Sequence, residues 1–441
     1  MEPRNIQSVL TRETIFPRPQ SHIKSVAPFL SKGVFTVHGE AWKNVRDLLR
    51  PQFTTRKLQD LVIFAKHVDI MFEAMPTIGD DGWTEEFSFL ELLHFFTLDT
   101  TTELLFGTSV NSQRAAMGER CRYLDTGTSI TLDNRLSPTN VAKAFDCANE
   151  WASLRMRLGS AYWLCDSLQF RRACKTVHDF TDKFVSQALK MSAEYHAVGS
   201  SALPSNKGGL IDSFADFATS SEELRYQTLH VLVAARDTTA AMVSWCLNRL
   251  LRNRTSLARL RSEVFAHFGT ETKPHQQINF VTLKACKYLQ WVLMETNRLY
   301  PAGPLNARTA TEDTILPVGG GPDGTQPIAL RKGTQVKFCN YLTHRDKSIW
   351  GEDAWEFRPE RWENRRHGWE YTPFGGGARL CPGQQYGLTE GGYVLVRLFQ
   401  RFDQIESMSP VQEMDKKQYK TIIVAKDGLR IRLHKANIAT A

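Results

Sequence analysis

Three consecutive glycines stand just ahead of a single cysteine in the segment YTPFGGGARLCPGQQYGL, residues 371–388. Glycine adopts backbone conformations that other residues avoid, so the run at 375–377 lets this loop approach a flat partner closely. Arg379 places a cation two residues before Cys381, and a helix is predicted to begin soon after. A cation and a helix N-terminus both favour a thiolate. With Phe374 beside it, this sulfur suits metal ligation better than acyl transfer, which would need a histidine base that no motif nominates.

The composition excludes several classes of protein. The chain has 441 residues and a formal net charge of +8, which is mild for its length, and it has no run of five like charges and no nucleic-acid-binding motif. Nucleic acid is therefore not an expected partner. Eight cysteines are scattered without a C-x-x-C pair, which indicates reduced thiols in a cytosol-facing protein. No apolar run approaches about 18 residues, so no transmembrane segment is predicted, and the polar start is not a signal peptide.

The spacing of apolar residues predicts a mainly helical chain with a minor antiparallel β portion. Helices are expected over 39–53, stopping at Pro51, in several stretches between 55 and 190, and over 220–254, 283–301 and 387–402. Short β-branched runs broken by Gly and Pro predict small strands between 315 and 345, and a last hairpin is expected over 420–435 with its turn at Asp427-Gly428. The small, polar segment 197–209 is the best loop candidate.

The cysteine segment resembles the haem-binding motif F-x-x-G-x-[RH]-x-C-x-G of the cytochrome P450 family. The matching positions are Phe374, Gly377, Arg379, Cys381 and Gly383. Four other motifs match in the family's order: WKNVR resembles W-x-x-x-R, AARDTT resembles [AG]-G-x-[DE]-T-[TS], ETNR resembles E-x-x-R, and FRPERW resembles P-E-R-[FW]. The resemblance spans residues 3 to 435 and is closest in wording to a fungal branch that includes alkane and fatty-acid hydroxylases. It implies the P450 fold, in which haem lies between a long central helix and the cysteine loop.

Glu295 and Arg298 are predicted to form a structural network with Arg361. The first two lie three residues apart on one predicted helix and so face the same way, and Arg361 could join them through charge-assisted hydrogen bonds. An exposed ion pair on a helix fits this spacing equally well. The resemblance favours the network, and it implies that the network holds the cysteine loop and takes no part in the chemistry.

Asp237 and Thr238 are the catalytic candidates. A threonine in the middle of an apolar helix usually bonds back to a carbonyl of its own helix, which is the simple structural interpretation. The resemblance implies instead that this acid and alcohol open the helix, seat water and relay protons while dioxygen is cleaved. Ala235 stands where the family has Gly, which would narrow the oxygen groove. Thr239 is expected to be a packing neighbour.

Four side chains are expected to bind the carboxylates of a haem. Trp42 and Arg46 lie four residues apart and share a helix face, and arginine suits two-point pairing with a carboxylate. Arg308 and Arg379 are the expected companions, because propionates buried in protein need cations. Core packing is the alternative for Trp42.

The resemblance implies a haem-thiolate monooxygenase that contains haem b with Cys381 as the axial ligand. It would insert one oxygen atom from O2 into a C–H bond of a hydrophobic small molecule, either a fatty acid or alkane or a secondary metabolite. Electrons would come from NADPH through a separate cytochrome P450 reductase, since the chain has no G-x-G-x-x-G dinucleotide loop. A basic face near Arg365, Arg366 and His367 is expected to attract an acidic reductase. The expected substrate pocket includes Phe16 and Phe35.

The start of the chain departs from the family pattern. Members of this branch begin with a membrane anchor, a proline-rich hinge and an opening helix with strands, and they are expected at the endoplasmic reticulum. The sequence is interpreted as one P450 domain over residues 1–441 that lacks these parts, with membrane association left possible. Two other functions stay open: a haem-thiolate isomerase that needs no reductase, which Asp237 and Thr238 argue against, and a haem-binding remnant without activity.

Overall fold

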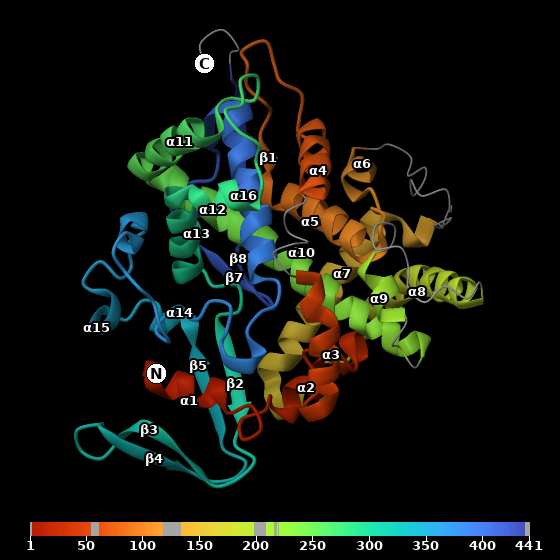
Figure 1. Cartoon of the computed structure of the whole chain (residues 1–441), viewed down its shortest axis with the longest axis vertical. Helices are drawn as coiled ribbons and strands as arrows, with labels where there is room; N and C mark the ends of the chain where they lie inside the picture. Colours follow the sequence, from red (N-terminus) through yellow and green to blue (C-terminus); the bar gives the residue numbers. More distant parts are fainter. Residues whose placement is uncertain are drawn as a thin grey trace. The chain divides into compact units, whose positions relative to one another are not determined.

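The computed structural model describes the chain except for residues 1, 54–60, 118–133, 198–208, 216–217, 219 and 437–441. The loop expected at 197–209 therefore lies almost wholly outside the described residues. The described chain forms two compact units. The first unit combines residues 1–20, 76–89 and 241–441, and the second combines residues 21–75 and 90–240. Figure 1 shows the elements in sequence colours, with helices in the large majority. The expected fold class, mainly α with small antiparallel sheets, is confirmed.

The first unit contains the C-terminal helices and every strand that the described residues form. Its helices are α1 (Pro3–Thr11), α11 (Arg254–Phe268), α12 (Phe280–Ala285), α13 (Lys287–Leu299), α14 (Asn340–Thr343), α15 (Lys347–Trp350) and α16 (Gln384–Arg401), with 3-10 turns at Pro359–Trp362 and Gly377–Arg379. Its strands are β1 (Phe87–Ser88), β2 (Leu305–Thr309), β3 (Thr314–Gly320), β4 (Gln326–Leu330), β5 (Gln335–Cys339), β6 (Phe402–Ser407), β7 (Lys417–Tyr419), β8 (Ile423–Ala425) and β9 (Arg430–Lys435).

All the strand pairs among the described residues are antiparallel. The order β1-β9-β6 forms one sheet, and β2-β5, β3-β4 and β7-β8 form two-stranded sheets. The last hairpin that the sequence predicted is wrong, because β8 pairs with β7 while β9 pairs with β6 and β1. Gly428 does turn the chain, with φ of 71°. The Asp-Gly signal identified the turn correctly, but it could not identify the partners of the two strands.

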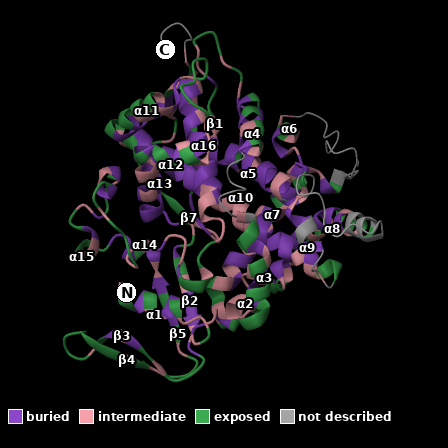
Figure 2. Cartoon of the chain, viewed as in Figure 1, coloured by how far each residue is buried: buried purple, intermediate pink, exposed green. Residues whose placement is uncertain are grey.

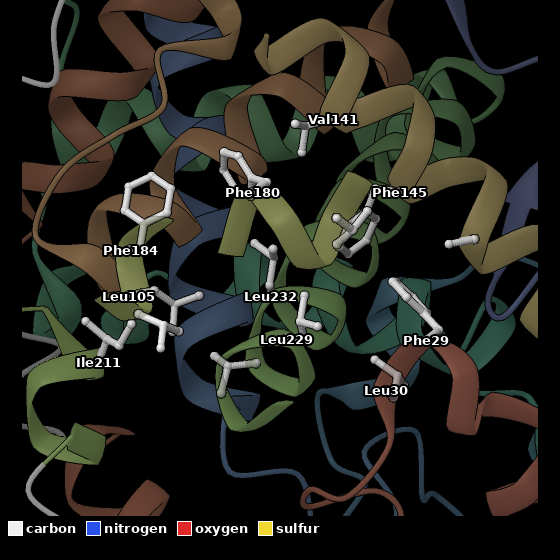
Figure 3. Packing of buried hydrophobic residues seen from close by; sticks show 14 of the residues in the cluster. Phe29, Leu30, Leu105, Val141, Phe145, Phe180, Phe184, Ile211, Leu229 and Leu232 are labelled. Carbon is white, nitrogen blue, oxygen red and sulfur yellow. The ribbon is translucent and has the colours of Figure 1, made fainter. Parts of the chain in front are cut away.

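The second unit is helical. It contains α2 (Gln20–Leu30), α3 (Gly39–Leu49), α4 (Val62–Glu73), α5 (Phe89–Phe106), α6 (Ser112–Ala116), α7 (Pro138–Leu158), α8 (Leu168–Ala197), α9 (Leu210–Ala215) and the first part of α10 (Ser221–Arg252), with one-turn helices at Arg50–Phe53, Asn134–Leu136 and Gly159–Leu164. Phenylalanine and leucine side chains from α2, α5, α7, α8, α9 and α10 form its core, which Figure 3 shows from close by. Most of these side chains are fully buried, so the helices of this unit pack on a continuous apolar interior.

Side-chain caps account for several helix boundaries. The Ser220 hydroxyl accepts from the backbone N–H of Glu223 at 3.1 Å, so α10 begins where the sequence predicted. The single helix expected over 283–301 is two helices, α12 and α13, because the backbone of Cys286 leaves the helical region with ψ of 87°. The α13 helix ends at Leu299, just before Tyr300 and Pro301, because a residue before proline disfavours helical dihedrals.

Candidate functional site

The cysteine loop is a compact turn in the first unit. The backbone N–H of Cys381 donates to the carbonyl of Phe374 at 3.0 Å, which closes the loop, and the α16 helix begins after its N-cap, Gly383. Gly375 and Gly377 have φ of 75° and 64°, a region that side chains other than glycine rarely adopt. A Cβ atom on Gly377 would lie 2.1 Å from the carbonyl oxygen of Leu10 in α1. These two glycines are therefore required by geometry. Cys381 itself is exposed.

The first unit also contains the network that the sequence predicted around Glu295. Its carboxylate accepts two hydrogen bonds from Arg298, each 2.8 Å long, and one from Nε of Arg361 at 3.3 Å. The indole N–H of Trp362 donates to the same carboxylate at 3.0 Å, a contact that the sequence analysis did not identify. Glu295 and Arg298 are both fully buried, which excludes the exposed helix pair. The α13 helix that carries them is largely buried in Figure 2.

His344 connects this network to the start of the cysteine loop. Arg298 donates to the His344 carbonyl at 2.6 Å, and Nδ1 of His344 lies 3.1 Å from the carbonyl of Arg298. Nε2 of His344 accepts from the backbone N–H of Thr372 at 3.0 Å, and the Thr372 carbonyl accepts from the N–H of Gly375. This arrangement requires a neutral ring. The pKa of His344 is lowered to about 3, mainly by burial and also by the positive charge of Arg298, while the hydrogen bond to the Arg298 carbonyl acts in the opposite direction.

A cluster of cations lies in the same unit. Arg379 donates to the carboxylate of Glu13 at 2.7 Å. Burial and the charges of Arg308 and Arg379 lower the pKa of Arg18 to about 9, while Glu13 acts in the opposite direction. Burial is also the main reason why the pKa values of Arg308 and Arg379 are lowered. The structure thus brings together two arginines that the sequence predicted, Arg308 and Arg379, and adds Arg18 and Glu13, which the sequence analysis missed.

The charge of this cluster fits a ligand with two carboxylates. Three arginines and one glutamate leave two positive charges in a buried setting, and like charges held together out of water are costly without an anion. Arg308 is 5% exposed, and its Nε has no hydrogen-bond partner, although one of its terminal nitrogens donates to the Ala307 carbonyl. A buried donor of this kind is able to bind a ligand. The residues present therefore fit the two propionates of a haem whose iron would be bound by Cys381.

Trp42 and Arg46 belong to the second unit. Both lie on α3, four residues apart as the sequence predicted; Trp42 is buried and Arg46 is half-buried. Trp42 is 7% exposed, so it packs in the interior as the alternative interpretation required. A role toward a propionate stays a prediction for both residues.

Asp237 and Thr238 lie on α10 in the part that belongs to the second unit. The Asp237 carboxylate accepts from Arg236 at 2.9 Å and from the amide of Asn149, in α7, at 2.9 Å. The Thr238 hydroxyl donates to the Ala234 carbonyl at 2.6 Å, which is the bond that the simple structural interpretation predicted. The α10 helix is continuous here, so the expected opening of the helix is absent. The fold-back hydrogen bond of Thr238 keeps the helical turn closed.

Two of the other expected positions also differ. Phe16 was expected in a substrate pocket, but it is fully buried in a core cluster of the first unit with Ile6, Val9 and Leu10 of α1. Arg365 was expected on an exposed basic face, but its guanidinium lies 4.1 Å from the ring centre of Trp350 and donates to the Ile349 carbonyl. In both cases the side chain packs against buried residues: Phe16 against α1, and Arg365 against Trp350.

Comparison with known proteins decides the family. The sequence model of the family described as "Cytochrome P450" matches residues 1–431, which is nearly the whole chain. The chain belongs to the cytochrome P450 family. The resemblance drawn from the motifs is confirmed, and membership in the family implies that a haem iron is held by a thiolate.

Several fungal P450 proteins are similar over most of this chain. Cytochrome P450 monooxygenase g430 of Fusarium sp is 42% identical over 414 residues, which cover 92% of this chain and 70% of the relative. Cytochrome P450 monooxygenase alt2 of Alternaria solani is 37% identical, with 94% and 77% covered. Cytochrome P450 52A3-B of Candida maltosa is 39% identical, with 92% and 75% covered. The described part of this P450 contains no helix both long and apolar enough to cross a membrane.

Proposed function

We propose that this P450 is a haem-thiolate monooxygenase that inserts one oxygen atom from O2 into a C–H bond of a lipophilic substrate. The observation that carries the proposal is the cysteine loop of the first unit, in which Cys381 lies at the end of a glycine-rich turn beside a buried cationic cluster. Two similar proteins, from Fusarium and Alternaria, are named as monooxygenases. The group to be held is haem b, which supplies the oxidising chemistry when it is bound.

The role proposed for Cys381 is to present a thiolate to the iron. Its backbone N–H is already used in closing the loop, and the α16 helix that begins three residues later directs its N-terminal N–H groups toward this part of the chain. A helix N-terminus stabilises negative charge on a nearby sulfur. A thiolate ligand donates electron density to iron and thereby favours cleavage of the O–O bond.

Arg18, Arg308 and Arg379 are proposed to bind the propionates. They lie in one buried cluster with Glu13, and the net charge of these four side chains is plus two. This charge balances the two negative charges of the propionates. Arginine can bond a carboxylate through two nitrogens at once, which fixes orientation as well as position. In this proposal the Glu295 network has a structural role, since it reaches the cysteine loop through His344 and Thr372.

Asp237 and Thr238 are proposed to move protons toward the oxygen that leaves as water. One oxygen of the Asp237 carboxylate accepts a hydrogen bond from the cation Arg236, and the other accepts one from the neutral amide of Asn149 in α7. A carboxylate that exchanges these partners for water can carry a proton from solvent. The Thr238 hydroxyl, bonded to Ala234, keeps a lone pair to accept a bond from that water.

The electron donor is proposed to be a separate reductase that takes electrons from NADPH. Arg366 and His367 are exposed, so the basic face proposed for docking is reduced to these two residues, because Arg365 packs on Trp350. For the substrate, a fatty acid or alkane and a lipophilic secondary metabolite are both proposed, since P450 proteins of one fold oxidise different compounds. Turnover assays with the two classes, with product mass as the readout, decide between them.

The proposal is tested by purifying the enzyme with haem and recording its reduced carbon-monoxide difference spectrum, with Cys381→Ser as the variant. The wild-type chain should show the band of a thiolate-bound haem and should consume NADPH with added reductase, while the variant should do neither. A variant that keeps both the band and the activity would refute Cys381 as the ligand. Product that forms without NADPH or reductase would favour the isomerase, and bound haem without any turnover would favour an inactive haem-binding protein.

A further inference from the structure

One cluster of potential metal ligands lies away from the cysteine loop in the described part of the first unit. Glu263 and His267 lie four residues apart on α11, and Cys286 lies at the junction between α12 and α13. The candidate ligand atoms of these three side chains all lie within 4.8 Å of one another. The α11 helix packs against α13, so the cluster joins two elements and is not a local feature of one helix.

The hydrogen bonds of His267 prepare one ring nitrogen to bind a cation. Its Nδ1 lies 2.9 Å from the carbonyl oxygen of Glu263. A carbonyl oxygen only accepts hydrogen bonds, so Nδ1 carries the proton and Nε2 keeps its lone pair. Histidines that bind metals commonly donate their second N–H to a carbonyl or a carboxylate, which fixes the ring. This bond leaves Nε2 as the nitrogen with a free lone pair, while Nδ1 also lies 3.8 Å from a carboxylate oxygen of Glu263, so the ring lies beside that carboxylate.

The burial of the three side chains is asymmetric. Cys286 is fully buried, whereas the side chains of Glu263 and His267 are about one-third exposed, at 34% and 31%. The sulfur thus lies at the inner end of the cluster and the carboxylate and imidazole lie at its outer end, through which an ion can enter. Burial raises the pKa of the Cys286 thiol to about 11, while the backbone N–H of Leu289 acts in the opposite direction.

We propose that Glu263, His267 and Cys286 form a binding site for a divalent zinc ion. Sulfur, imidazole and carboxylate are the ligand types that zinc combines, and three protein ligands with a water molecule complete its tetrahedron. On binding, zinc displaces the proton of the Cys286 thiol to solvent, and the resulting thiolate and the Glu263 carboxylate together balance the two charges of the ion. Ligand atoms around a tetrahedral zinc lie about 3.3 to 3.6 Å apart. Side-chain rotations that move the ligand atoms by about 1 Å therefore bring this cluster to the required geometry.

The ion would link α11 to the start of α13. The α13 helix carries Glu295 and Arg298, so zinc would brace the helix on which the buried network depends. Because the site uses none of the residues assigned to haem, zinc binding does not depend on the proposed activity. An ion that binds the folded chain and not the unfolded chain raises the midpoint of thermal unfolding as its concentration rises.

The test is zinc uptake by the haem-loaded enzyme, measured by elemental analysis after dialysis against zinc. The wild-type chain should retain zinc in a one-to-one ratio, and Glu263→Gln and Cys286→Ser should lose it. The Cys339→Ser variant, which removes a half-buried cysteine outside the cluster, is the matched control and should retain zinc. The haem absorption band should not change on zinc addition, which separates this site from attack on the haem thiolate.

Two results would overturn the proposal. One is equal zinc retention by the wild-type chain and Glu263→Gln, which would indicate an adventitious ion only. The other is no zinc above the background of the buffer in the wild-type chain. If Cys286→Ser does not fold, Glu263→Gln and His267→Gln still decide the question, because both side chains are partly exposed and tolerate change. In those variants zinc should also fail to raise the midpoint of thermal unfolding.

Discussion

Replacing His344 with Gln should remove a large part of the acid sensitivity of this P450. The ring is neutral and buried in the folded chain, where its pKa is about 3, against an ordinary value of 6.5 in the unfolded chain. Below that ordinary value the unfolded chain binds a proton that the folded chain rejects. The contribution of His344 to stability is therefore complete above about pH 6.5 and is lost as the pH falls toward 3.

The size of the effect follows from the two pKa values. Each unit of pKa corresponds to about 1.4 kcal/mol. A pH of about 5 lies roughly 1.5 units below the pKa of His344 in the unfolded chain, so His344 lowers the free energy of unfolding by roughly 2 kcal/mol at that pH. At about pH 5 the folded ring is still neutral, so the result does not depend on the exact folded pKa. Gln offers one acceptor for the Thr372 N–H and one donor for the Arg298 carbonyl, but it does not titrate.

The assay is urea unfolding of the haem-loaded enzyme, followed by circular dichroism, between about pH 7.5 and pH 5. The wild-type chain should lose roughly 2 kcal/mol more than His344→Gln over this range. All other titrating groups are shared and cancel in the difference, and His275→Gln, which changes an exposed histidine, should follow the wild-type curve. Parallel pH curves for the wild-type chain and His344→Gln would refute the reasoning. The carbon-monoxide spectrum should weaken at acid pH in the wild-type chain first, because His344 holds Thr372 at the start of the cysteine loop.

Three further predictions concern the network, the cations and the proton path. Glu295→Gln should lower the unfolding free energy by about 3 to 5 kcal/mol in urea, because Arg298 is then left in the core without its charged partner. Arg18→Gln should speed the transfer of haem to an apo-globin acceptor by about ten- to one-hundred-fold, because it removes the charge-assisted bond to a propionate that we propose for Arg18. Asn149→Ala should lower the share of NADPH oxidation that yields product by up to about tenfold, because Asp237 loses one of its two donors.

Each of these variants has an exposed control. Glu352→Gln breaks a surface pair with Lys347 and should cost less than about 1 kcal/mol. Arg331→Gln and Asn140→Ala change exposed residues and should leave haem transfer and product yield unchanged. A loss of stability in Glu295→Gln no larger than in its control, haem transfer at the wild-type rate in Arg18→Gln, or unchanged coupling in Asn149→Ala would each contradict the role assigned to that residue.

Residues close together in the sequence were predictable, because their geometry is set within one element. Glu295 and Arg298 share a helix face at a spacing of three, and the conformations of Gly375 and Gly377 follow from the glycine run that precedes Cys381. The cap of α10 at Ser220 is likewise local. These features need only the dihedral angles of a few neighbouring residues, which the sequence specifies directly.

Contacts between distant segments were predictable only where a family motif connected them, as for Arg361 and Glu295, and the other long-range contacts were missed. Arg379 and Glu13 are 366 positions apart, and His344 reaches Thr372 across 28 positions, so no periodicity connects them. The break between α12 and α13 at Cys286 was missed because the spacing of apolar residues continues through it. That spacing does not report the backbone dihedral angles of a single residue. The expected helix opening at Thr238 came from a resemblance, and Ala235 in place of glycine is the local difference that accompanies the closed turn.

The division of the chain between the two units has a consequence for biosynthesis. Every residue of the second unit has been synthesised once Ala240 has been translated, so this unit can begin to fold on the nascent chain as soon as it emerges from the ribosome. The first unit must wait, because β1 pairs with β9 and α1 packs against β3 and the cysteine loop. Apolar side chains of α1, such as Ile6 and Val9, therefore stay without many of their native neighbours until β3 and β5 emerge. Chaperone capture of nascent chains should accordingly concentrate on the first twenty residues.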